Sequence, residues 1–584
     1  MKQKVLKVHP KDNVLVALTD LQKGETIEFG GESFLLLDEV KAKHKFFTTD
    51  LKQGDDVIMY GVLVGKAQKD IAKGSWMSTE NIKHAAEPFF YRKTDFQWHA
   101  PDVSKFAGRT FNGYHRSNGD VGTANYWLFI PTVFCENRNM DVIKEALHNE
   151  LGYAVADKYK QYTHQLIEAY KNGQNIESVN IFDTPASAAI NRPFKNVDGI
   201  KFLNHQGGCG GTRQDAGILG KLLASYANHP NVAGVTVLSL GCQNLQTADF
   251  LSELKTFNPD FDKPLYIFEQ QQSQSEEQLV AEAIKKTFEG LIEINKIERK
   301  PAPLTKLTIG VKCGGSDGFS GISANPSVGV LSDLVVALGG KILLAEFPEL
   351  CGAEQNLIDR TLDEAAAKKF MHLMTTYNNQ ALSVGSGFHM NPSPGNIKDG
   401  LITDAIKSNG AALKGGTSPV VDVLDYTEPV TKPGLSLVCT PGNDVEATTG
   451  KAASGATLIL FTTGLGTPTG NPVCPTIKVS TNSNLTKRMN DIIDIDCGPV
   501  VEGEKAIEQM GEEILEYCIK AASGEIIPKA VLLNQDDFIP WKRGVSLYFV
   551  FLGPAFGILL SIVCHSLVRH TIVHFFSKAE QNTI

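Results

Sequence analysis

The sequence predicts a multidomain α/β protein, with a β-rich domain at the N-terminus followed by two larger α/β domains. Its 584 residues can form several hydrophobic cores. Residues 1–92 alternate apolar and polar side chains, as half-buried strands do, and Gly and Asp interrupt them at short intervals. From residue 104 onward, continuous apolar runs alternate with segments of helical periodicity. We therefore expect domains at 1–92, 104–300 and 301–545, with an apolar C-terminal extension at 546–584.

The elements of the middle domain follow from these two patterns. The runs 124–135 and 231–242 are predicted to be buried strands, and 140–172 and 275–299 to be amphipathic helices. Residues 84–108 carry prolines and isolated aromatic side chains, which indicates an extended segment lying on the next domain.

Long polar loops distinguish the third domain. Four runs combine Gly, Ser, Thr, Asn and Pro with charged residues or Cys: 312–329, 346–360, 388–396 and 439–482. Glycines allow backbone amides to approach a ligand, and open α/β sheets bind ligands where strands end in such loops. The loops match neither a dinucleotide-binding GxGxxG motif nor a phosphate-binding P-loop.

Composition excludes several classes of protein. The formal net charge of −9 and the lack of a long basic block argue against a nucleic-acid partner. Ten scattered cysteines without a CxxC pair exclude a zinc ribbon and do not suggest a disulfide scaffold. The N-terminal residues contain no apolar signal region. We expect a cytoplasmic protein with reduced thiols.

The four polar runs, together with residues 111–137, resemble the altronate and galactarate dehydratase family, and the resemblance extends from about Val5 to about Leu547. It implies an N-terminal SAF-type domain, a divalent metal that is usually iron, and removal of water from six-carbon sugar acids to give 2-keto-3-deoxy acids. The expected protein is a hydro-lyase acting on altronate in hexuronate catabolism, with Fe²⁺ first and Mn²⁺ second as cofactor. Galactarate is the rival substrate, and a non-catalytic sugar-acid-binding protein is the rival class. The expected partner is a small sugar acid, and homo-oligomerisation stays open.

The resemblance directs the search for metal ligands to the SAF-type domain. The family's HxHN element is replaced here by Ser78, Thr79, Glu80 and Asn81. Glu80 can still offer oxygen to a metal, and His44 stands where the family commonly has His. Fewer imidazoles and more oxygen ligands favour harder cations.

A Gly-rich turn in the middle domain offers a second set of candidates. His205, Cys209 and Arg213 lie within it, and Cys242 follows a predicted strand. His205 is either the general base or part of a mixed nitrogen and sulfur metal site with Cys209 and Cys242, and a purely structural turn is the third interpretation. Asp317 and Arg360 complete the predicted catalytic set.

The predicted substrate-binding residues are polar or cationic side chains of the loops. Arginine and lysine would bind a carboxylate, while Ser and Asn would hydrogen-bond to hydroxyl groups, and such a site rejects analogues that lack the hydroxyls. The set comprises Arg116, Arg213, Ser316, Asn325, Asn396, Asn443 and Lys478.

The C-terminal extension contains an uncharged apolar run, residues 545–564, between Lys542 and Arg543 on one side and Arg569 on the other. Its length meets the minimum for a membrane-spanning helix. Three interpretations stay open: a membrane anchor, a segment packed on a partner subunit, or a non-native extension past the usual end of the family.

Overall fold

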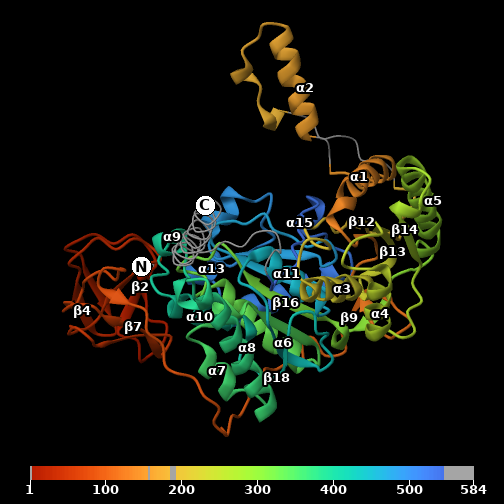
Figure 1. Cartoon of the computed structure of the whole chain (residues 1–584). Coiled ribbons are helices and arrows are strands. Elements are labelled where there is room, and N and C mark those ends of the chain that lie inside the picture. The colour runs from red at the N-terminus through yellow and green to blue at the C-terminus, as the bar shows by residue number, and fades with distance from the viewer. Residues whose placement is uncertain (1–2, 156–157, 184–191, 545–584) are drawn as a thin grey trace, which may run out of the picture.

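The computed structural model describes residues 3–155, 158–183 and 192–544. The N-terminal region is built of short antiparallel strands (Figure 1, red). Three small sheets have the orders β1-β2-β5, β3-β4 and β6-β7-β8. The strands are β1 (Val5–Leu6), β2 (Val14–Ala17), β3 (Thr26–Phe29), β4 (Glu32–Leu35), β5 (Lys45–Phe47), β6 (Asp56–Met59), β7 (Val62–Ala67) and β8 (Ile82–Lys83).

The middle region contains a parallel sheet of order β12-β11-β13-β14 and a small antiparallel sheet of order β10-β9-β15. The parallel strands are β11 (Tyr126–Pro131), β12 (Gly199–Phe202), β13 (Val232–Ser239) and β14 (Leu265–Glu269). The antiparallel strands are β9 (Thr110–His115), β10 (Val121–Gly122) and β15 (Lys300–Pro303). The helices are α1 (Asn137–Leu151), α2 (Lys158–Lys171), α3 (Arg213–Asn228), α4 (Thr247–Phe257) and α5 (Glu276–Ile294).

One predicted helix of this region is wrong in its length. The single helix expected over 140–172 is two helices. The first, α1, ends at Leu151, because the next residue, Gly152, has a φ of 75° in the left-handed region that glycine adopts without strain. In Figure 1, α2 stands away from the body of the molecule. The strand predicted over 231–242 and the helix over 275–299 are confirmed as β13 and α5.

The third region is a seven-stranded parallel sheet of order β18-β19-β17-β16-β20-β21-β22. Its strands are β16 (Thr308–Cys313), β17 (Lys341–Ala345), β18 (Val420–Leu424), β19 (Gly434–Val438), β20 (Leu458–Thr463), β21 (Thr476–Ser480) and β22 (Ile495–Asp496). Its helices are α6 (Ala324–Ala337), α7 (Glu354–Asp359), α8 (Glu364–Ser383), α9 (Pro394–Lys398), α10 (Asp404–Ala412), α11 (Asp444–Ala453), α12 (Ser483–Arg488), α13 (Gly498–Val501), α14 (Ile507–Ala522) and α15 (Lys529–Leu532). The central strands are buried along their whole length, as expected of a parallel sheet with helices on both faces.

The three regions pack against one another. Leu128 of the middle sheet and Leu343 of the large sheet belong to one hydrophobic core. A second core joins Val64 of the N-terminal region to Ala405 of α10. Beside that contact, Thr403 Oγ1 donates to the Val64 carbonyl at 2.8 Å. The N-terminal region is therefore held against the loops at the carboxyl edge of the large sheet.

The predicted fold class, a β-rich N-terminal domain followed by α/β domains, is confirmed. Within the described residues, no helix combines the length and the apolar character that crossing a membrane requires. The apolar run 545–564 lies outside the described residues.

Candidate active site

A buried group of charged side chains lies at the carboxyl edge of the large sheet. Lys312 is near the end of β16, Glu346 follows β17, and Asp444 begins α11 after β19. These three strands are neighbours in the sheet, so their ends meet at one edge. The Lys312 ammonium forms an ion pair with Glu346 and lies 3.0 Å from Asp444 Oδ1.

Two further lysines approach the same glutamate. Lys414 Nζ lies 3.7 Å from Glu346 Oε2 and donates to the Cys313 thiol at 2.7 Å. Lys451 Nζ lies 3.8 Å from the same oxygen, beyond hydrogen-bond distance, and has no hydrogen-bond partner among the described residues. Glu346 itself has a φ of 73°, a strained conformation for a residue other than glycine and one that is found most often at functional sites.

A second ion pair extends the group toward the surface. Lys407 Nζ of α10 lies 3.0 Å from Glu349 Oε1 and donates to Asn391 Oδ1 at 2.9 Å. The Cys313 thiol donates to Glu349 Oε2 at 3.5 Å. Lys407 and Glu349 are each 8% exposed at the side chain, whereas Lys312 and Lys451 are fully buried. This pair is therefore the part of the group nearest to solvent.

We call these residues the lysine–carboxylate cluster. Its members are Lys312, Lys407, Lys414, Lys451, Glu346, Glu349, Asp444 and Cys313.

The lysine–carboxylate cluster carries a net positive charge at neutral pH. Burial opposes the charged form of Glu349, yet Lys407 and Lys312 lower its pKa to about 2. Burial likewise opposes the ammonium of Lys312, but Glu346 and Asp444 hold its pKa well above the ordinary value. Burial lowers the pKa of Lys451 to about 8. At neutral pH four ammonium groups face three carboxylates, an arrangement suited to an additional anion.

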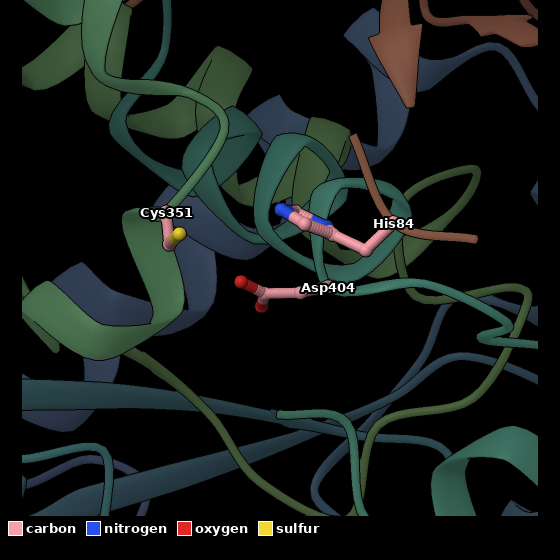
Figure 2. Close-up of side chains that lie close together, drawn as sticks. All are labelled: His84, Cys351 and Asp404. Carbon is pink, nitrogen blue, oxygen red and sulfur yellow. The ribbon is translucent and has the colours of Figure 1, made fainter. Parts of the chain in front are cut away.

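A candidate metal site adjoins this cluster (Figure 2). His84 follows β8, Cys351 follows the 3-10 helix η6 (Phe347–Leu350), and Asp404 is the first residue of α10. Their nitrogen, sulfur and oxygen ligand atoms all lie within 4.8 Å of one another, and Figure 2 shows the three side chains directed toward a common space. The N-terminal region thus supplies one ligand, and the large domain supplies two.

The donor set of His84, Cys351 and Asp404 fits a divalent metal. The Asp404 Oδ2 atom is buried and has no hydrogen-bond partner in the described chain, so a cation would give it one. A mixed N, S and O set suits Fe²⁺ and similar transition ions better than Mg²⁺ or Ca²⁺.

A second group with metal-ligand spacing, Cys313, Glu346 and Glu349, does not fit a cation. Its ligand atoms also lie within 4.8 Å of one another. Lys312 and Lys407 already neutralise the two carboxylates, however, and a cation placed among these ammonium groups would be repelled. This group belongs to the lysine–carboxylate cluster.

The metal-ligand group and the lysine–carboxylate cluster share two elements. The helix α10 carries Asp404 and Lys407 on the same face, three residues apart. The segment after β17 carries Glu349 and Cys351. A metal and an anionic substrate would therefore meet at one place.

The predicted catalytic residue Asp317 lies at the contact with the N-terminal region. Its fully buried carboxylate lies 3.1 Å from Lys43 Nζ and accepts hydrogen bonds from Ser320 and Thr481 at 3.1 Å each. Lys43 also lies 3.2 Å from Asp399 Oδ1. In this structure Asp317 fixes the docking of the N-terminal region, and its catalytic role stays a prediction.

The other two predicted catalytic residues make backbone contacts. His205 Nε2 donates to the Pro131 carbonyl at 2.7 Å, and its Nδ1 accepts from the Gly207 amide at 3.0 Å. Burial lowers the pKa of His205 to about 4. Arg360 donates to the Ser418 carbonyl at 2.6 and 3.0 Å. Both side chains hold loops in place, and their predicted roles in catalysis stay predictions.

The two metal ligands predicted in the SAF-type domain, His44 and Glu80, differ in their surroundings. Both ring nitrogens of His44 are hydrogen-bonded, to the Lys398 carbonyl at 3.0 Å and to Trp76 Nε1 at 3.2 Å. Glu80 lies in an exposed turn. Cys209 and Cys242 are both exposed, on neighbouring loops of the middle domain. Their ligand roles are untested predictions.

Three predicted substrate-binding residues, Ser316, Asn325 and Asn396, lie in the loops beside the candidate active site. Asn396 Nδ2 donates to the Ser316 carbonyl at 2.8 Å, which ties two polar loops together. Asn325 bonds to the Gly410 carbonyl at 2.9 Å and accepts from Thr462 at 2.6 Å. These contacts shape the edge of the sheet.

The remaining predicted substrate-binding residues are spread over the molecule. Arg116 donates to the Pro230 carbonyl at 2.7 Å, and Arg213 begins α3 at the surface. Asn443 caps α11 through the Val445 amide at 3.0 Å. Lys478 donates to Gln535, and burial lowers its pKa to about 8. Asn443 directly precedes Asp444 of the lysine–carboxylate cluster, whereas Arg116, Arg213 and Lys478 make their contacts on other loops.

Sequence reasoning missed the residues that form the two groups described here. Lys407, Lys414 and Lys451 are not among the predicted residues, and His84 begins the stretch 84–108, which is predicted only to be an extended segment lying on the next domain. Glu346 and Glu349 lie in the polar run 346–360, and the sequence predicts no role for either. A usable signal was the presence of lysines in segments that are otherwise small and apolar, such as 404–416 and 444–456.

Comparisons with known proteins agree with this architecture. Three family models match in succession: the altronate/galactarate dehydratase SAF domain at residues 3–85, the second domain of D-galactarate dehydratase/altronate hydrolase at 113–295, and the D-galactarate/altronate dehydratase C-terminal domain at 304–546.

Similar full-length proteins span all three domains. Altronate dehydratase of Bacillus subtilis (strain 168) is 35% identical over 93% of this chain and 99% of its own length. Altronate dehydratase of Escherichia coli (strain K12) is 34% identical with the same coverage. Galactarate dehydratase (L-threo-forming) of E. coli is 29% identical over 89% of this chain and 93% of its own length. The chain belongs to the altronate/galactarate dehydratase family.

Proposed function

We propose that this protein is a hydro-lyase that removes water from D-altronate to give 2-dehydro-3-deoxy-D-gluconate, in the cytoplasm, as a step of hexuronate catabolism. The observation that carries the choice of substrate is the near-complete alignment with two altronate dehydratases, at higher identity than with the galactarate enzyme. The lysine–carboxylate cluster supports an anionic substrate independently of these relatives.

The chemistry makes two demands that the residues can meet. The proton next to the substrate carboxylate must be removed, and negative charge then builds on that carboxylate. The ammonium of Lys407 is the most accessible cation of the cluster and would bind the carboxylate, with Asn391 positioned beside it. The deeper lysines add a positive field that favours the charge developing in the reaction.

A metal ion next to Lys407 would orient the bound substrate. His84, Cys351 and Asp404 would hold a divalent ion, for which we infer Fe²⁺ from the mixed donor set, with Mn²⁺ as the second choice. Such an ion supplies Lewis-acid stabilisation of an oxygen anion. Because Lys407 and Asp404 lie on one helix, a carboxylate held by Lys407 would have its neighbouring hydroxyl close to Asp404.

The substrate assignment is tested by a coupled assay for 2-keto-3-deoxy acids. The purified protein is incubated anaerobically with Fe²⁺ or Mn²⁺ and with D-altronate, galactarate or a control aldonate. We expect the highest kcat/KM with D-altronate. A higher kcat/KM with galactarate would make galactarate the assigned substrate. Binding of altronate without turnover of any sugar acid would indicate the non-catalytic alternative.

The metal site is tested by affinity measurements on variants. His84→Ala and Asp404→Asn should each weaken Fe²⁺ or Mn²⁺ binding by about tenfold or more, the usual loss when a metal shell is perturbed. His44→Ala and Glu80→Ala serve as matched variants for the SAF-based assignment. Loss of metal in the second pair, with normal binding in the first, would move the site to His44 and Glu80.

The carboxylate-binding role of Lys407 is tested by kinetics. Lys407→Met should raise KM for D-altronate strongly, because the most accessible cation is removed, while Lys369→Met at the surface provides a matched control. An unchanged KM in the Lys407 variant would exclude this residue from substrate binding.

A further inference from the structure

Three exposed cysteines gather at a second sheet edge, in the middle domain. Cys135, Cys209 and Cys242 follow β11, β12 and β13, which are adjacent parallel strands in the order β12-β11-β13. All three are free and exposed, whereas the other described cysteines are buried or half-buried.

Hydrogen bonds next to each cysteine tie the three loops to one another. The Phe134 amide donates to the Gly207 carbonyl at 3.0 Å, which joins the Cys135 and Cys209 loops. The Asn244 amide donates to the Gly208 carbonyl at 2.9 Å, which joins the Cys209 and Cys242 loops. Gln243 Nε2 donates to Thr132 Oγ1 at 3.2 Å, which closes the set.

Glycine allows this close approach. Gly208, directly before Cys209, has a φ of 95°, and a Cβ atom there would lie 2.2 Å from the Thr132 carbonyl oxygen. The chain therefore presses the Cys209 loop against the Cys135 loop at a position where only glycine fits.

The spacing of the three sulfurs does not fit a single metal ion. The groups with all ligand atoms within 4.8 Å among the described residues do not include these three sulfurs. A single tetrahedral ion, with metal–sulfur bonds of about 2.3 Å, needs its sulfurs closer than that. Gln271 Nε2 donates to Cys242 Sγ at 3.2 Å, a type of hydrogen bond that tunes iron–sulfur clusters. A cavity of about 340 Å³ begins at the Cys209 loop.

We propose that Cys135, Cys209 and Cys242 bind an iron–sulfur cluster of the [4Fe–4S] class through three thiolates. The fourth iron then has no cysteine ligand and is open to an oxygen ligand of a small molecule. This site is separate from the His84 group, and it does not depend on the assigned substrate.

Anaerobic reconstitution of the full-length protein with Fe³⁺, sulfide and a thiol reductant, which reduces part of the iron, tests the proposal. We expect about four irons and four acid-labile sulfides per chain, the broad visible absorption of an iron–sulfur cluster, and an electron paramagnetic resonance signal after reduction. The Ser variants of Cys135, Cys209 and Cys242 should each lose most of the sulfide and absorption. Cys518→Ala, which changes a buried cysteine remote from these loops, should retain both.

Further measurements separate the proposal from its rivals. Circular dichroism of each variant checks that loss of the cluster does not reflect unfolding. The Gln271→Ala variant should still bind the cluster, but with a changed reduction potential, because the hydrogen bond to Cys242 Sγ is removed. Binding of one metal ion without sulfide, or full cluster content in all three Ser variants, would overturn the proposal. So would a disulfide among the three cysteines that resists the thiol reductant and prevents iron from binding.

Discussion

Replacing Lys451 by Met should make the protein more stable at neutral pH, although it deletes a charged residue next to a carboxylate. The Lys451 ammonium is fully buried, lies 3.8 Å from Glu346 Oε2, and forms no hydrogen bond with any described residue. Glu346 retains Lys312 and Lys414 as partners when Lys451 is removed. The substitution therefore leaves no uncompensated charge behind.

The magnitude follows from the pKa of Lys451, which burial lowers from 10.5 to about 8. Below pH 8 the lysine is protonated in both the folded and unfolded states, and the folded state bears the full cost of burial. That cost is about 3 kcal/mol, because one pKa unit corresponds to about 1.4 kcal/mol. It declines as pH rises from 8 to 10.5, where the folded state has released the proton and the unfolded state has not. Lys451→Met should thus gain about 3 kcal/mol at pH 7 and much less at pH 10.

Urea unfolding at pH 7 and at pH 10 measures this difference, with Lys312→Met as the matched variant. Lys312 pairs with Glu346 and Asp444, so its removal should cost about 3–5 kcal/mol, the usual penalty for breaking a buried ion pair. Opposite signs for the two lysines are the critical result. Comparable destabilisation in both variants would refute the idea that burying the Lys451 charge costs more than its contact with Glu346 returns.

Three other outcomes are expected. Lys43→Met should reduce thermal stability and increase hydrogen exchange in β5, because Asp317 loses its cation from the N-terminal region; unchanged exchange would contradict that docking role. The free energy of unfolding should fall as pH decreases from 6.5 toward 3. Burial lowers the pKa of His229 to about 3, so the unfolded state binds a proton at a higher pH than the folded state does. In urea titrations, His229→Gln should flatten this pH dependence. Truncation after Leu547 should leave specific activity unchanged, as measured by the coupled assay, and activity loss would place the extension in the folded core or an interface.

The fold class could be predicted from the sequence because it depends on local patterns of apolar and polar residues. Alternating residues in 1–92 and continuous apolar runs such as β13 identify antiparallel and parallel sheets directly. The failure over 140–172 is also local in origin. Apolar periodicity continues across Gly152, while the chain itself stops the helix there with a left-handed turn.

The active site was less accessible to sequence reasoning because its members are distant in the chain and their chemistry depends on pairing. A lysine in a strand, such as Lys312, is normally interpreted as exposed, and burial becomes acceptable only when Glu346 and Asp444 are known to meet it. His84 was overlooked for the same reason, since its nearness to Asp404 arises from docking of the N-terminal region on α10.

The cost of burying Lys451 bears on function. A hydrophobic residue at this position would make the protein more stable, so stability does not explain a buried ammonium that has no hydrogen-bond partner among the described residues. Its charge gives the lysine–carboxylate cluster its surplus of one positive charge, beside the metal-ligand group of His84 and Asp404. An empty site then bears an electrostatic penalty that a bound carboxylate relieves. A positive site preformed in this way stabilises the negative charge that develops on the substrate carboxylate without having to reorganise during the reaction.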